Sequence, residues 1–378
     1  MNYVQLKDVC VINMGQSPDS NSYNDCGEGL PFFQGNADFG EMYPVTRKWC
    51  SSPTKIASEN DILISVRAPI GALNYAKESC CIGRGLAALT PNKSKVSPAF
   101  IFWLLKSKNE ELNSKGTGST FKAIGRKVLE ETLIPNISLG EQIVCAKALE
   151  KIYYIMQTCQ QQLQKLDELV KARFVELFGD PISNPMNWNK RTLKEVCTKL
   201  NDGTHFSPES FSMGDYKYIT AKNIKASGFD FSNITYVPEA VHRPIFERCN
   251  PEQGDVLYIK DGATTGIAIV NTLKEEFTLL SSVALLKQNR NVINGYFLAA
   301  LLNNADMYSD IRNNMGGAAI TRLTIAKLNA VKVIVPPLDL QNRFAAFVHQ
   351  VDKSKAAVQK SLDEAQLLFD SLMQQYFG

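Results

Sequence analysis

Two stretches of the sequence combine several basic side chains with a turn of small residues. Residues 112–129 and 311–335 each contain four lysines or arginines and no acidic residue. Their turns, Gly116-Thr-Gly-Ser-Thr120 and Gly316-Gly-Ala-Ala-Ile-Thr321, would let backbone N–H groups come close to a phosphate. One basic stretch is usually solvated surface, but two at matching places favour contact with DNA phosphates. The candidate residues are Lys115, Thr117, Ser119, Thr120, Lys122 and Arg126, and in the second stretch Arg312, Thr321, Arg322 and Lys327.

A second group of residues has side chains that could read bases. Arg, Lys, Asn and Gln carry the paired donors and acceptors that recognise base edges. The candidates are Gln34, Asn36 and Arg67 in the first half, and Lys222, Asn223, Lys260 and Asp261 in the second. Thr264 and Thr265 are further candidates for contact with DNA. They lie in expected loops that differ between the halves. Different base preferences and neutral loop drift both explain that difference, and the sequence alone leaves both open.

Residues for catalysis or cofactor binding form no recognisable pattern. The sequence has no G-x-x-x-x-G-K-[ST] loop, and Asn184-Pro185-Met186 lacks the second proline of the amino-methyltransferase tetrapeptide. Its three histidines, His205, His242 and His349, are scattered, and its nine cysteines include no C-x-x-C pair. We therefore expect no catalytic residue, metal or cofactor in this chain.

An internal repeat organises the elements that must position these residues. Leu6-Lys7-Asp8-Val9-Cys10 recurs as Leu193-Lys194-Glu195-Val196-Cys197, and Asp61-Ile-Leu-Ile-Ser65 recurs as Asp255-Val-Leu-Tyr-Ile259. Further matches follow in the same order, with offsets that drift from 187 to 201 and settle at 199. They include Ala99 with Gly295, Gln142 with Gln341, and Phe178-Gly179 with Phe377-Gly378. The chain is therefore expected to consist of two copies of one half.

Each half is expected to have an α+β front part. Short β-branched runs at 62–66, 256–259 and 331–335 predict strands. Ser97-Pro98 offers an N-cap and a first-turn proline for an apolar helix to about Leu105, and Asn294 starts its counterpart.

The rear of each half carries a heptad pattern that predicts a long helix. Apolar residues alternate steps of three and four, and we expect the two helices to pack on each other. Ser354 and Ser361 interrupt the second stripe. The expected seam consists of Leu149, Ile152, Met156, Leu163, Leu166, Val170 and Leu177, and of Phe347, Val351, Val358, Ala365, Leu368 and Leu372. Because the first helix would span roughly 55 Å at about 1.5 Å per residue, it could hold two DNA-reading parts about one and a half turns of duplex apart.

Bulk properties fit an ordinary globular chain. The 378 residues are 44% hydrophobic and 21% charged, and the net charge of +3 is too near neutral to indicate nucleic-acid binding by itself. An odd number of cysteines and the absence of a leader or membrane-spanning run predict free thiols in a cytoplasmic protein.

With these features the chain resembles the specificity subunit of a type I restriction–modification system over nearly its whole length. The matching motifs are the openings Leu6-Lys-Asp-Val and Leu193-Lys-Glu-Val, the strand–turns Asp61-Ile-Leu-Ile and Asp255-Val-Leu, Ile334-Val-Pro-Pro337, and Leu177-Phe-Gly-Asp-Pro181 with Asn184-Pro185. In the first half, Ile134-Pro-Asn departs from the motif by lacking the second proline.

The resemblance implies two target-recognition domains with twisted β-sheets, residues 1–139 and 181–339, separated by antiparallel coiled-coil helices at 140–180 and 340–378. It also implies a bipartite site in double-stranded DNA, two methyltransferase subunits and two restriction (motor-nuclease) subunits as partners. S-adenosylmethionine, ATP and Mg would belong to those partners. Two alternatives remain open at this point: a coiled-coil scaffold with two protein- or glycan-binding domains, and a stand-alone nuclease or methyltransferase.

Overall fold

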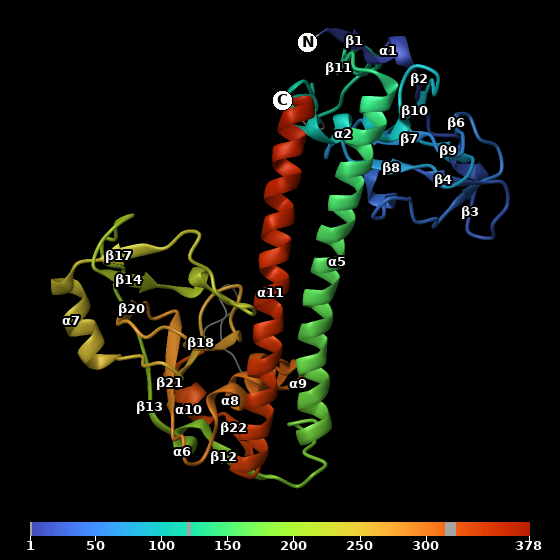
Figure 1. Cartoon of the computed structure of the whole chain (residues 1–378). Coiled ribbons are helices and arrows are strands. Elements are labelled where there is room, and N and C mark those ends of the chain that lie inside the picture. Colours follow the sequence, from blue (N-terminus) through green and yellow to red (C-terminus); the bar gives the residue numbers. More distant parts are fainter. Residues whose placement is uncertain (1, 119–121, 314–322) are drawn as a thin grey trace. The chain divides into compact units, whose positions relative to one another are not determined.

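The structure is a computed structural model that describes residues 2–118, 122–313 and 323–378. The chain forms two compact units, one of residues 1–160 and 360–378 and the other of residues 161–359. Each unit therefore takes its own front part and portions of both long helices, whereas the sequence suggested a four-part division. Figure 1 shows the course of the chain.

The first unit is built on an antiparallel sheet in the order β2-β10-β7-β8. Its strands are β2 (Cys10–Met14), β7 (Ile62–Ser65), β8 (Leu73–Tyr75) and β10 (Leu86–Pro91). A second sheet has the order β3-β5-β4-β9-β6 and contains one parallel pair, β4 with β9. It consists of β3 (Tyr23–Asn24), β4 (Leu30–Phe33), β5 (Trp49–Cys50), β6 (Ile56–Ala57) and β9 (Cys80–Ile82). A short pair joins β1 (Tyr3–Gln5) to β11 (Leu133–Pro135).

The second unit repeats this plan. Its sheet β13-β21-β18-β19 is also antiparallel, and β12 (Asn189–Thr192) pairs with β22 (Lys332–Val335). The four strands are β13 (Cys197–Asp202), β18 (Val256–Ile259), β19 (Ala268–Val270) and β21 (Val283–Gln288). A three-stranded sheet β17-β14-β20 again contains a parallel pair, β14 with β20, and β15 pairs with β16. These strands are β14 (Tyr216–Ile219), β15 (Ile224–Lys225), β16 (Gly228–Phe229), β17 (Thr235–Val237) and β20 (Phe277–Leu279). The predicted repeat is therefore present in the strand order.

Helices follow the same plan in both halves. In the first half they are α1 (Leu6–Val9), α2 (Pro98–Ser107), α3 (Asn109–Ser114), α4 (Arg126–Glu130) and α5 (Leu139–Phe178). In the second half they are α6 (Leu193–Val196), α7 (Glu239–Arg248), α8 (Gly295–Leu302), α9 (Ala305–Asn313), α10 (Ile325–Ala330) and α11 (Leu338–Phe377). Three single 3₁₀ turns, η1 (Ser20–Ser22), η2 (Asn36–Asp38) and η3 (Ala221–Asn223), complete the described elements. Among them, α7 has no helical counterpart in the first half.

A central strand in each main sheet is buried along its whole length because it lies between two apolar clusters. All four residues of β7 are buried; Ile62 and Ile64 face one apolar cluster while Leu63 belongs to another. In β18, Val256 and Tyr258 likewise face one cluster, and Leu257 and Ile259 face the other. A strand buried on both faces loses the alternation of polar and apolar residues that a half-exposed strand shows.

A buried glutamine ties each long helix to the N-cap of an earlier helix in its half, α2 in the first half and α8 in the second. The Gln142 side-chain oxygen accepts from Ser97 N at 2.9 Å, and that of Gln341 accepts from Asn294 N at 2.8 Å. Their amide groups donate to Ile137 O and Pro336 O. Ser97 therefore corresponds to Asn294, which moves the repeat alignment here by one residue from the pairing of Ala99 with Gly295 predicted from the sequence.

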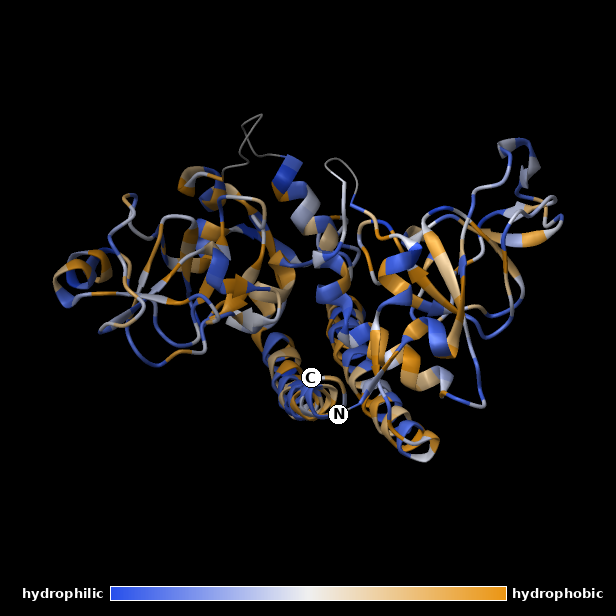
Figure 2. Ribbon diagram, turned by 90° about the horizontal axis from the view of Figure 1, so that it is seen from above, coloured by the Kyte–Doolittle hydropathy of each residue, from blue (hydrophilic) through white to orange (hydrophobic). Residues whose placement is uncertain are grey.

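The long helices carry a buried stripe inside each unit. On α5 every predicted seam residue is buried or half-buried. On α11 the prediction for Leu368 is wrong: this side chain is 51% exposed, whereas Phe369 is 8% exposed and contacts Trp103 with ring centroids 5.6 Å apart. After Val351 the next position of the stripe lies four residues further on, at 355. The stripe then continues through positions 358, 362, 365, 369, 372 and 376. Ser354 and Ser361 are therefore exposed and do not interrupt the stripe. Figure 2 shows both hydrophilic and hydrophobic residues along the long helices.

Candidate nucleic-acid interface

In the first unit, backbone hydrogen bonds bring together the chain segments that carry four predicted site residues. Gly85 N donates to Gln34 O (3.1 Å), Val66 N to Gly85 O (2.9 Å) and Ile124 N to Val66 O (2.9 Å). Thr117 and Ala123 bond to each other in both directions, and Ala123 forms a bridge with Arg67. We call this arrangement the first ladder. It holds the exposed side chains of Gln34, Arg67, Thr117 and Lys122.

A glycine on each side of Arg84 makes the first ladder possible. A Cβ on Gly85 would lie 2.4 Å from Gln34 O, and one on Gly83 would lie 2.9 Å from the Gln34 side-chain oxygen. Only glycine allows this close approach of two chain segments. Arg84 is exposed between them. Sequence reasoning missed Arg84, although Gly83-Arg84-Gly85 is a signal that could have revealed it.

The cations of the first unit fall into two classes. Arg67, Arg84 and Lys122 make no ion pair with the part of the chain that the structure describes. By contrast, Lys115 lies 2.6 Å from Glu111, Arg126 3.6 Å from Glu130 and Lys127 3.8 Å from Glu131. The hydrogen bond from Lys115 lowers the pKa of Glu111.

Residues 112–129 contain no acidic residue, but most of their cations are nevertheless paired with carboxylates. Glutamates just outside the stretch reach back to its cations, because residues four apart share a helix face. The positive charge of Lys115 and Arg126 is therefore partly compensated. Asn36 is half-buried in η2, and Ser119 and Thr120 lie outside the described residues.

The second unit contains an equivalent ladder. Lys260 N donates to Ser282 O at 2.9 Å, Leu323 N donates to Lys260 O at 3.0 Å, and Ala221 N donates to Ser282 Oγ at 3.2 Å. We call this the second ladder. Lys222 and Thr264 are exposed near it, while Thr321 and Arg322 lie outside the described residues.

Several residues of the second half that were predicted to contact DNA are buried and hold the fold together. Lys260 is 4% exposed, with its Nζ 3.3 Å from Asp202 and 2.8 Å from Asp261. Asn223 is buried, and its side chain accepts from Thr220 and donates to Asp230 O. Thr265 is also buried, and its hydroxyl donates to Gly262 O at 2.6 Å. These three cannot reach a base without rearrangement.

The remaining predicted residues of the second half lie on helices or beside the buried lysine. Arg312, near the end of α9, is half-buried, and its guanidinium lies 5.3 Å from the Tyr308 ring centroid. Lys327 is exposed on α10. Asp261 is half-buried beside Lys260.

Sequence reasoning also missed a group of donors around Asp202. Asp202 is 3% exposed, and its carboxylate lies 3.2 Å from His205 Nε2 and 3.8 Å from Arg248 Nη1. No local pattern reveals this group, since Arg248 is 46 residues away from Asp202 in the sequence.

Several other side chains of types that could do chemistry are buried. His242 is buried, stacked on Tyr216 with ring centroids 3.8 Å apart, and its Nδ1 lies 2.9 Å from the Thr278 hydroxyl. Burial raises the pKa of Cys80, Cys145 and Cys249 to about 12, which disfavours the nucleophilic thiolate. Within the described residues, no group of three His, Cys, Asp or Glu side chains could hold a metal. None of the described helices is long and apolar enough to cross a membrane.

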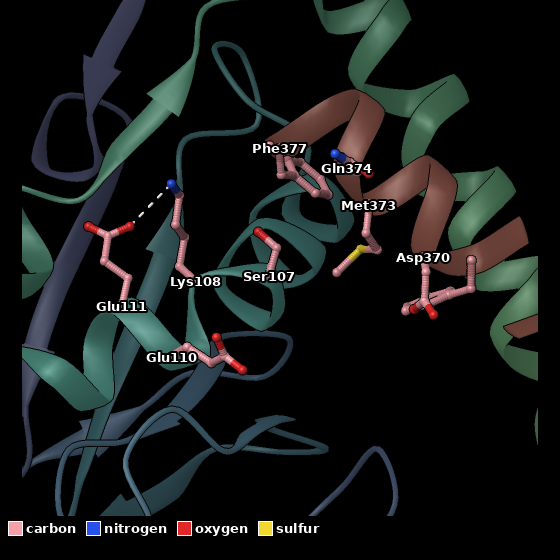
Figure 3. A pocket seen from close by; sticks show the side chains of 10 residues that line it. Ser107, Lys108, Glu110, Glu111, Asp370, Met373, Gln374 and Phe377 are labelled. Atoms are coloured by element: carbon pink, nitrogen blue, oxygen red, sulfur yellow. Dashed lines mark ion pairs between the residues drawn. The ribbon is translucent and has the colours of Figure 1, made fainter. Parts of the chain in front are cut away.

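A surface pocket of the first unit lies away from the ladder residues. It has a volume of about 470 Å³ and is lined by α2–α3 and the end of α11, including Ser107, Lys108, Phe369 and Phe377. Lys108 and Glu111 form an ion pair at its rim, 3.1 Å apart (Figure 3). Its lining combines charged, polar and apolar side chains.

Comparison with known proteins agrees with the duplicated plan. The family model described as the type I restriction modification DNA specificity domain matches residues 1–168 and 185–366. The type I restriction enzyme MjaIX specificity subunit of Methanocaldococcus jannaschii is 22% identical over 98% of this chain and 90% of its own length. A putative MjaX specificity subunit of the same organism is 43% identical, but the match covers 42% of this chain and only 38% of that relative.

A solved structure has the same fold. The crystal structure of the type I restriction–modification S subunit from M. genitalium has a TM-score of 0.67, with 17% identity, and the match covers 100% of this chain and 96% of that one. Because the family model matches most of the sequence, once in each half, the chain belongs to the family of type I restriction–modification specificity proteins.

Proposed function

We propose that this chain is the DNA sequence-specificity subunit of a type I restriction–modification complex, and that each half reads one part of a bipartite site. The observation that carries the proposal is the pair of equivalent ladders built on the same strand order but presenting different side chains. The first ladder exposes Arg67, Arg84 and Lys122, which suit contact with phosphates and base edges. A common frame with different exposed groups is what two separate sequence preferences require.

The proposal extends to the partners that perform the chemistry. Two methyltransferase subunits and two restriction subunits would bind this chain, and they would hold S-adenosylmethionine, ATP and Mg. This chain would be non-catalytic and cytoplasmic, and its nine free cysteines are compatible with a reducing compartment.

Exposed apolar side chains on the long helices support the docking of partner subunits. In the first unit, Val144 is 65% and Tyr154 72% exposed on α5, and Leu367 is 71% exposed on α11. Apolar and aromatic groups of this kind are enriched at protein interfaces.

The test is to map methylated adenines in cells that express the chain with its cognate methyltransferase. We expect methylation at one bipartite sequence, with two defined parts and an undefined gap. Methylation that depends on the methyltransferase but not on this chain would contradict the proposal. A chain that binds proteins or glycans and shows no salt-dependent DNA binding would favour a scaffold instead.

A further inference from the structure

A buried pair of opposite charges lies next to the second ladder. Asp202, at the end of β13, and Lys260, just after β18, are 3% and 4% exposed, and their charged atoms are 3.3 Å apart. Removing such charges from water is costly, and a buried ion pair often stabilises a fold no better than apolar residues of similar size.

The first half shows that the fold does not need this pair. Asp202 is opposite Ala284 in the sheet as Met14 is opposite Ala87, and Val66 follows β7 as Lys260 follows β18. Val66 is buried in the apolar core of its unit, and Met14 is partly buried and packs against that core. The same two places in the same sheet thus accept an apolar pair, so a role other than folding is indicated for the charges.

What the pair does is visible in the contacts of Asp202. Its carboxylate binds His205 at 3.2 Å and Arg248 at 3.8 Å, and Arg248 also donates to Gly203 O. The side chains of His205 and Arg248 are 66% and 43% exposed. Lys260 lies against the same carboxylate from the buried side. Asp202 therefore holds two outward-facing donors in place.

We propose that Arg248 and His205 are base-contacting residues of the second recognition domain, positioned by the Asp202–Lys260 pair. This inference rests on the proposed function. It names protein residues that contact the part of the DNA site read by the second half of the chain. The forked donors of arginine match the O6 and N7 acceptors of guanine in the major groove. Arg248 thus selects a guanine in the part of the site that the second half reads.

The test uses the full chain with its methyltransferase and scores methylation or binding across a library of randomised sites. Arg248→Lys keeps the charge but removes the fork. We expect it to lose selectivity at one guanine of the second half-site by about tenfold to a hundredfold. Preference in the first half-site should be unchanged. The matched control is Arg243→Lys on the same helix, whose guanidinium is paired with Glu239 and Glu276.

Equal weakening on all sequences by Arg248→Lys would make Arg248 a phosphate contact and overturn the inference, as would unchanged selectivity. If the unaltered chain selects no bipartite sequence, the proposed function itself fails. If the unaltered chain selects a bipartite sequence but Arg248→Lys is as selective as the control Arg243→Lys, the proposed function stands and only the inference about Arg248 fails.

A double variant, Asp202→Met with Lys260→Val, tests the positioning role. It installs the residues that the first half carries at these places, so the chain should remain folded, as judged by its unfolding transition. We expect selectivity at the same guanine to fall while the first half-site is still recognised. Retained selectivity in a folded double variant would show that the pair does not position Arg248.

Discussion

At the scale of single residues, the partners of a cation decide what it can offer to DNA. An exposed ion pair contributes little to stability, but it competes with a phosphate for the cation. Lys127 and Glu131 are 3.8 Å apart, whereas Lys122 lies on the first ladder with no ion pair among the described residues. The two lysines are five residues apart and both exposed, so they form a natural comparison.

Lys122→Ala should weaken DNA binding to a similar degree on all sequences, because a phosphate contact carries no base information. The slope of log affinity against log salt should become shallower by about 0.9, since the variant neutralises one phosphate fewer. Fluorescence anisotropy at several salt concentrations measures both quantities. Lys127→Ala, the control, should change the slope less. A slope that Lys122→Ala leaves unaltered would remove this residue from the interface.

Residue environments were only partly predictable from the sequence. The pairing of Lys115 with Glu111 follows from helical spacing and could have been anticipated. The burial of Lys260 could not, because its partner Asp202 is 58 residues away and approaches only through the sheet. Contacts between distant segments depend on the fold, which no local window contains.

At the scale of elements, the stripe on α11 shows where pattern reading fails. Leu367, Leu368 and Phe369 are three consecutive apolar residues, so the sequence permits more than one register for the stripe. In the structure Phe369 is the buried position of the stripe, because its ring packs on Trp103 and lies 6.4 Å from the ring of Tyr153. On α5, by contrast, every predicted position is buried or half-buried, although the most buried residues near the end of this helix are Phe174 and Phe178, which were not predicted.

Phe369→Ala should lower the free energy of unfolding by about 3–5 kcal/mol, because it leaves a cavity beside Trp103. Leu368→Ala, one residue away and half exposed, should lower it by less than about 1 kcal/mol. Urea denaturation of both variants gives the comparison directly. Similar losses of stability in the two variants would contradict a stripe that runs through Phe369.

The exposed face of α5 permits a separate prediction about assembly. Val144→Asp with Tyr154→Ser should prevent the chain from forming a stable complex with its methyltransferase, because a charge then meets an apolar partner surface. The stability of the chain itself should change by no more than about 0.5 kcal/mol per substitution. Size-exclusion chromatography of the mixed proteins is the measurement, and Gln160→Asp, exposed on the same helix, is the control. Normal assembly of the double variant would place the docking surface elsewhere.

At the scale of the whole molecule, the sequence repeat predicted the common sheet of the two halves but not the elements inserted around it. Both main sheets have equivalent strand orders, and both accessory sheets contain a parallel pair. The helix α7, which contributes Arg248, has no helical counterpart among the described residues of the first half. The drift in repeat offset records such differences in length without saying what structure fills them.

Each long helix is divided between the two units, which allows a test of whether the helices fix the distance between the two parts of the DNA site. The division falls after residue 160 in α5 and before residue 360 in α11, and the two main apolar clusters share no residue. Proline breaks a helix by removing a hydrogen bond and by steric clash. Gln162→Pro with Lys360→Pro should therefore interrupt both helices and leave both cores folded.

If the helices fix the distance between the two parts of the site, this double proline variant should accept spacers one base pair longer or shorter than the original chain does. Each part should still be recognised, since the ladders lie outside the altered helices. Binding to a panel of duplexes with different spacers is the measurement, and the double alanine variant at the same positions is the control. A spacer preference as narrow as that of the control would mean that contacts other than the continuous helices set the distance, and the role assigned to their length would be wrong.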